Sequence, residues 1–159
     1  MEIRRSALLE FPAEDIFDII EGAEHYPAFL PGCEAVTILE RTESIIAAKV
    51  AIAWRGLRFA FTTRNPKRRP HWLAVRLEEG SAFARLDGGW NIRALSPEAC
   101  RVELALRCEL QGAVVRGLAG VVIDSVADAL MNAYVARAHA LAASRSGAAA
   151  NALHYDQPT

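Results

Sequence analysis

Residues that could carry chemistry are few in this sequence, and their spacing forms no catalytic signature. Histidines are scattered along the chain at His25, His71, His139 and His154. No nucleophile elbow, paired-histidine zinc motif or phosphate-binding loop is present. The three cysteines form no CxxC pair, so neither a zinc site nor a disulfide framework is expected. The sequence therefore predicts a non-enzymatic protein that requires no cofactor and holds no metal.

Positive charge is concentrated between residues 55 and 72, on what the pattern predicts to be a turn at 65–70. The candidate contacts are Arg64, Lys67, Arg68 and Arg69, followed by His71 and Trp72. Such cations can bind the phosphates of RNA or of lipid headgroups; the alternative is a solvated hairpin tip without a partner. Because the net charge is only −1, any such contact must be local, and DNA is not expected as a partner.

The segment 24–33 combines two prolines, two aromatic side chains and a cysteine. Pro27 suits the first turn of a helix, since its missing N–H would be unpaired there. Pro31 disfavours helical geometry at Leu30, so the helix should last about one turn. The segment either closes one end of a core or forms a lid over an apolar cavity.

Periodicity predicts the elements that must position these residues. Alternation with a period of two predicts strands over 2–10, 34–41, 44–54, 57–64, 72–78, 83–95 and 101–110, with a bulge or bend at Gly88-Gly89. Helical spacing of apolar residues predicts helices over 13–22, ending at Gly22, and over 112–145. Residues 1–146 should form one domain, and residues 147–159 a disordered tail.

This order predicts an α+β helix-grip fold. A curved antiparallel sheet of seven strands wraps around the long C-terminal helix, and two short helices follow the first strand. Space left between helix and sheet is the natural ligand site. The expected lining consists of Tyr26, Phe29, Leu30, Phe59, Phe61, Trp90, Val122, Val126 and Leu130.

Several motifs, in this order, resemble one family. They are Tyr26-Pro27-x-Phe29-Leu30-Pro31-x-Cys33, Phe61-Thr62-Thr63-Arg64-Asn65, Leu77-x-x-Gly80, Leu86-Asp87-Gly88-x-Trp90, and Ala133-Tyr134 followed by Arg137-Ala138. Together they resemble the coenzyme Q-binding protein and ribosome-association toxin family of the START-like, polyketide cyclase-like superfamily. The resemblance covers residues 2–140. It departs at Gly32, where the family often has tryptophan, and at Ser81-Ala82-Phe83, where the family tends to have Pro-Phe directly.

The resemblance implies a START-like domain and three functions. The first is binding of ubiquinone or a polyprenyl intermediate in support of respiration. The alternative is a toxin that binds the large ribosomal subunit, through Arg64, Lys67, Arg68 and Arg69, and blocks subunit association. The third is an oligoketide cyclase or aromatase, which needs a titratable pair inside the cavity, and the sequence supplies no convincing one. The expected location is the cytoplasm or the periphery of the inner membrane, with transient contact with the membrane surface.

Overall fold

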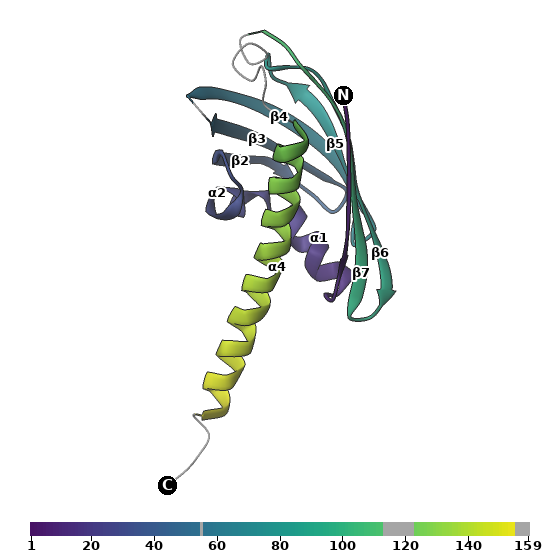
Figure 1. Ribbon diagram of the computed structural model, residues 1–159, viewed down its shortest axis with the longest axis vertical. Coiled ribbons are helices and arrows are strands. Elements are labelled where there is room, and N and C mark those ends of the chain that lie inside the picture. Colours follow the sequence, from purple (N-terminus) through teal and green to yellow (C-terminus); the bar gives the residue numbers. More distant parts are fainter. Residues whose placement is uncertain (55, 113–122, 155–159) are drawn as a thin grey trace.

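The computed structural model describes residues 1–54, 56–112 and 123–154. Within them, seven antiparallel strands form one sheet in the order β1-β7-β6-β5-β4-β3-β2. The strands are β1 (Glu2–Leu9), β2 (Cys33–Arg41), β3 (Ile45–Trp54), β4 (Leu57–Arg68), β5 (Trp72–Glu79), β6 (Phe83–Ser96) and β7 (Ala99–Leu110). The sheet curves, and the long helix crosses its concave side (Figure 1). The predicted helix-grip architecture is confirmed.

Short helices follow β1, as predicted. They are α1 (Ala13–Glu21), a 3₁₀ turn η1 (Ala23–His25) and the single turn α2 (Tyr26–Phe29). The N–H of Gly22 donates to the carbonyl of Asp18 and caps α1. Leu30 is extended, with φ −86° and ψ 127°, because the following proline disfavours helical geometry. The prolines of segment 24–33 therefore set both the start and the end of α2.

The long helix α4 (Ile123–His154) differs in extent from the predicted helix over 112–145. Residues 113–122 lie outside the described residues, so the predicted start is not placed. At the other end the helix continues past Arg145 and Gly147 to His154. Alanine has the highest helix propensity, and the alanine-rich sequence after Ser146 sustains the helix without an apolar stripe. The predicted tail from 147 is thus helical up to 154, and residues 155–159 are not described.

The core lies between the sheet and the helices. On α1, Ile16, Phe17 and Ile20 share one face, and Phe17 is only 1% exposed. The buried side chains of α4 are Ala127, Met131 and Ala138. The sheet contributes Leu73, Trp90, Ile92, Cys100, Val102 and Leu104 to the same cluster. The helical face on α4 and the alternation along β7 were both predicted.

Strand β4 is longer than expected, which corrects the predicted turn at 65–70. Lys67 and Arg68 pair with Leu73 and Trp72 of β5, so the strand continues through Pro66. A proline lacks the N–H that a strand ladder uses, which is why the sequence suggested a turn there. The inward and outward alternation that begins at Leu57 consequently extends to Arg68.

Gly88 and Gly89 do not form the predicted bulge. Pairing between β6 and β7 is continuous at both residues, and the register shifts fall instead near the two ends of β6. The close approach of the strands explains the glycines. A Cβ on Gly88, whose φ is +140°, would lie 2.0 Å from the carbonyl oxygen of Ala105. The register thus excludes the bulge of the predicted bulge or bend, and both glycines have positive φ values, of 140° and 157°, where the neighbouring strands approach closely.

On the outer face of the sheet, two ion pairs join β2 and β4 across β3, the strand between them. Arg64 on β4 bonds Glu40 on β2 at 2.5 Å, and both residues pair in register with Ala47 of β3. Arg58 and Glu34 make a second, longer pair of 3.7 Å between the same two strands. Ala47 points outward yet is only 2% exposed, since the Arg64–Glu40 pair covers it.

Candidate functional site

Tyr134 of α4 joins segment 24–33 to the sheet. Its ring meets those of Tyr26, Phe29 and Trp90 edge-on, with centroid separations of 5.6, 5.7 and 4.9 Å. This geometry is the one that aromatic pairs prefer. The guanidinium of Arg137 lies 5.2 Å from the centre of the Phe29 ring. Three residues predicted to line a cavity thus pack around one helix residue.

A hydrogen-bond chain runs through the same cluster. The Tyr134 hydroxyl bonds to that of Tyr26, which donates in turn to the carbonyl oxygen of Ile20 at the end of α1. Burial raises the pKa of both tyrosines above the ordinary value. Both hydroxyls therefore stay protonated to a higher pH than an ordinary tyrosine hydroxyl, and the chain links segment 24–33 to α4 and to the end of α1.

The helix–sheet interface beside this cluster is closely filled. Its apolar void is about 10 Å³, lined by residues that include Ile16, Trp90, Met131 and Tyr134. Such a volume holds about one water molecule. Segment 24–33 packs next to this void through the contacts of Tyr26 and Phe29 with Tyr134.

A second aromatic cluster lies elsewhere on the concave face. Phe59 and Phe61 of β4 contact Phe83 of β6, with centroids 6.0 and 5.1 Å away. All three are half-buried. Phe83 reaches β4 because β5 ends at Glu79, and Gly80 allows close approach, since a Cβ there would lie 2.7 Å from that of Phe61. The sequence analysis missed Phe83, although Gly80 beside it was a signal.

Among the described residues, five of the predicted lining residues divide between two aromatic clusters. Tyr26, Phe29 and Trp90 belong to the Tyr134 cluster, whereas Phe59 and Phe61 belong to the second one. The remaining described members, Leu30, Val126 and Leu130, are half-buried. Val122 lies outside the described residues.

Three of the four predicted phosphate contacts are already ion-paired. Lys67 points inward, has a side chain only 8% exposed and bonds Glu21 of α1 at 3.1 Å. Arg69 makes two hydrogen bonds to Asp18, of 2.8 and 2.9 Å. Arg64 bonds Glu40 as described above. Arg68 is exposed, and no ion pair of its side chain occurs within the described part of the chain.

An unpredicted polar groove separates α1 from α4. It has a volume of about 110 Å³, and its polar lining side chains are those of Asp15, Asp18, His25, Arg137 and Arg145. Arg145 bonds Asp15 at 3.3 Å, which ties α4 to the start of α1. These residues are far apart in sequence, so no local motif indicated the groove.

Reactive clusters do not appear among the described residues. No group of three or more histidine, cysteine, aspartate or glutamate side chains there could hold a metal ion. The buried polar side chains reported for this part are those of Thr62 and Thr63. Tyr26 and Tyr134 are the titratable side chains of the Tyr134 cluster, and both are hydrogen-bonded, whereas the cluster of Phe59, Phe61 and Phe83 consists of apolar rings. Within the described part of the chain, no helix is long and apolar enough to cross a membrane.

The fold defines a START-like helix-grip protein. It superimposes on the Zhui aromatase/cyclase of Streptomyces sp. R1128 with a TM-score of 0.71, over 87% of this chain and 93% of the other, at 20% identity. Residues 9–135 match the family described as Polyketide cyclase / dehydrase and lipid transport. The chain belongs to this family, in the branch that contains the ribosome association toxins.

Two relatives show the range of similarity. The ribosome association toxin RatA of Pseudomonas aeruginosa is 36% identical over 139 residues, which cover 87% of this chain and 96% of the relative. A coenzyme Q-binding protein COQ10 homologue of Xenopus laevis is more distant, at 21% identity over 84% of this chain and 56% of that protein. The resemblance seen in the sequence motifs is confirmed.

Proposed function

We propose that this protein associates with the ribosome, at the large subunit, and interferes with subunit association. The observation that carries the proposal is the 36% identity to a ribosome association toxin along nearly the full length of both chains. The filled interface around Tyr134 also supports a role at the surface, because its void holds about one water molecule.

The test is co-sedimentation of the purified protein with isolated large and small subunits. We expect it to sediment with large subunits and to reduce the fraction of joined subunits in a density gradient. Phosphate contacts predict that the logarithm of affinity falls linearly with the logarithm of salt concentration, with a slope of roughly −0.7 per contact with single-stranded RNA. Absence from large subunits at low salt, with subunit joining unchanged, would contradict the proposal.

A second candidate function is binding of an isoprenoid quinone or similar lipid. The observation favouring it is the half-buried cluster of Phe59, Phe61 and Phe83 on the concave face, which presents apolar surface in the position where helix-grip proteins have room for a ligand. Burial of that surface by a ligand would contribute about 25 cal/mol per Å².

Native mass spectrometry of protein purified gently from its own host tests this candidate. A stoichiometric lipid, with quinone absorbance after organic extraction, is the supporting result. Phe61→Lys should then remove the ligand, whereas Leu8→Lys, at a position that is 69% exposed on the outer face, should not. An empty protein that fails to bind added quinone would count against the lipid. A cyclase is the third candidate, because no observation on the described residues favours it over the first two.

A further inference from the structure

The outer face of the sheet has two ends with different charge arrangements. At one end, opposite charges face each other across neighbouring strands. Arg107 of β7 pairs in register with Glu2 of β1 and with Asp87 of β6, and Asp87 pairs in register with Arg76 of β5. Directly opposed unlike charges stabilise a sheet. This end of the face is balanced.

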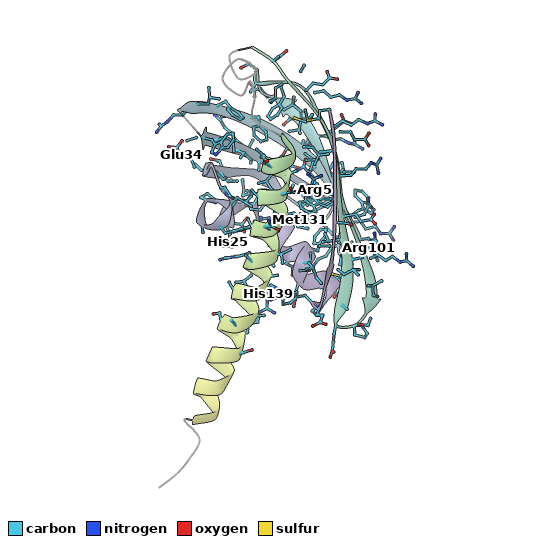
Figure 2. All side chains as sticks on the ribbon, viewed as in Figure 1. Arg5, His25, Glu34, Arg101, Met131 and His139 are labelled. Atoms are coloured by element: carbon cyan, nitrogen blue, oxygen red, sulfur yellow. The ribbon has the colours of Figure 1, made fainter. Side chains whose placement is uncertain are left out.

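At the other end, like charges face each other. Arg93 of β6 stands directly opposite Arg101 of β7, an arrangement that destabilises a sheet. Arg101 bonds Glu103 on its own strand at 2.9 Å, whereas Arg93 is exposed and makes no ion pair with the residues that the structure describes. Figure 2 shows Arg101 on the side of the sheet away from α4, and Arg5 on the side of α4. Positive charge therefore gathers here in excess of its local partners.

An exposed aromatic residue lies within the same region. Trp72 of β5 is 37% exposed, and its register partners are Arg68 on β4 and Asn91 on β6. Because Asn91 and Arg93 are two residues apart on β6, their side chains leave the sheet on the same face. The four side chains of Arg68, Trp72, Arg93 and Arg101 thus share one surface that spans β4 to β7.

We propose that this surface, the arginine–tryptophan corner (Arg68, Trp72, Arg93 and Arg101), binds a single-stranded segment of ribosomal RNA. The inference rests on the proposed function and names the contact surface. Stacking of unpaired bases on aromatic side chains, flanked by cations that bind the backbone phosphates, is the general mode of single-strand recognition. Three strand spacings of about 4.8 Å separate β4 from β7, so the corner is about 14 Å wide. That width accommodates a short run of nucleotides.

The corner differs from the cations that the sequence analysis singled out. Lys67 and Arg69 would have to leave Glu21 and Asp18 before they could bind phosphate. Arg68 belongs both to the predicted phosphate contacts and to the corner. Its side chain makes no ion pair within the described structure that would have to break before it could bind phosphate. A phosphate between Arg93 and Arg101 would in addition relieve their mutual repulsion. Arg68 and Arg93 can therefore bind an anion without breaking an ion pair in the described structure, whereas Arg101 would exchange Glu103 for the phosphate.

The test compares two double variants that remove the same charge from the same face. Arg68→Gln with Arg93→Gln alters the corner, and Arg76→Gln with Arg107→Gln alters the balanced end. Each is measured by co-sedimentation with large subunits across a salt series, and by fluorescence anisotropy with a short labelled single-stranded RNA. Trp72→Ala and Trp72→Phe test stacking separately, because phenylalanine retains an aromatic ring.

For the corner variant we expect weaker binding and a salt slope reduced by about 1.4, the contribution of two single-strand phosphate contacts. The balanced-end variant should keep the wild-type slope. Trp72→Ala should bind about 5- to 150-fold more weakly, and Trp72→Phe should restore most of the loss. Equal weakening of the two double variants, or wild-type binding by the corner variant, would overturn the inference.

Failure of the proposed function gives a different pattern. If the wild-type protein does not sediment with subunits, the proposed ribosome association is wrong. The anisotropy measurement with single-stranded RNA then tests by itself whether the arginine–tryptophan corner binds RNA. Corner-dependent binding to RNA then still supports it. No RNA binding, or corner-dependent binding to anionic vesicles without RNA binding, overturns it.

Discussion

Replacement of Tyr134 should show how much of the stability depends on the contact between segment 24–33 and α4. Tyr134→Ala removes a ring that contacts Tyr26, Phe29 and Trp90. Truncating a large buried aromatic side chain costs about 3–5 kcal/mol. Since Tyr134 is half-buried, we expect the lower end of this range, about 3 kcal/mol.

Tyr134→Phe separates packing from hydrogen bonding. The ring contacts remain, but the hydroxyl that bonds to Tyr26 is lost. A hydrogen bond of this kind contributes about 1 kcal/mol. The alanine variant should therefore lose roughly three times the unfolding free energy that the phenylalanine variant loses.

Urea unfolding and thermal unfolding, each followed by circular dichroism, measure both effects as a free energy of unfolding and as a Tm. In a chain of this size each 1 kcal/mol lowers Tm by about 2–4 °C, so we expect falls of about 6–12 °C for alanine and 2–4 °C for phenylalanine. A double-mutant cycle with Phe29→Ala should give a coupling of about 0.5–1.5 kcal/mol. Leu8→Ala, at an exposed position, is the control. A loss below about 1 kcal/mol for Tyr134→Ala would refute the packing argument, as that is less than the ring contacts alone require.

Three further predictions concern pH and backbone packing. Burial raises the pKa of Tyr26 above the value of about 10 that it has in the unfolded chain. The stability that this group provides is therefore present below pH 10 and is lost as the pH rises further. Tyr26→Phe should reduce the fall in unfolding free energy between pH 10 and 11. Burial opposes ionisation of Glu24, but the hydrogen bond and charge of Arg41 outweigh it and lower the pKa from 4.5. Wild type should therefore be more stable than Arg41→Gln at pH 7, and urea unfolding at pH 3 should show a smaller difference. Gly88→Ala should lower the free energy of unfolding, measured by thermal unfolding, by about 2–6 kcal/mol, through both overpacking and backbone strain. Gly56→Ala should lower it clearly less, because no atom lies within 4 Å of the added Cβ. Equal losses would contradict the close-approach explanation.

Local sequence signals predicted most of the fold, because they act over a few residues. Gly22 ends α1 and the prolines delimit α2, as their backbone preferences require. The alternation along β7 survives in its burial pattern. Such features depend on chain neighbours alone, and they suffice to determine the order and type of the elements.

The candidate site was less predictable, because it depends on register between distant strands. The sequence analysis predicted a turn at 65–70, so the alternation of β4 was not extended to Lys67. Counted in steps of two from Leu57, Lys67 lies on the concave face, where its side chain bonds Glu21. The opposition of Arg93 and Arg101 follows from the pairing of β6 with β7, which no single strand reveals. Likewise, Phe83 meets Phe61 across the end of β5 only in three dimensions.

The covered alanine of β3 has a consequence for tolerance to substitution. Ala47 faces outward, yet the side chains of Arg64 and Glu40 from the two neighbouring strands close over it. A scan of every amino acid at each position should therefore find Ala47 as restricted in size as an interior residue. Lys49, two residues further along the same face and exposed, should accept most replacements. The outer surface of this sheet thus contains a position whose permitted side chains are limited by a salt bridge and not by the core.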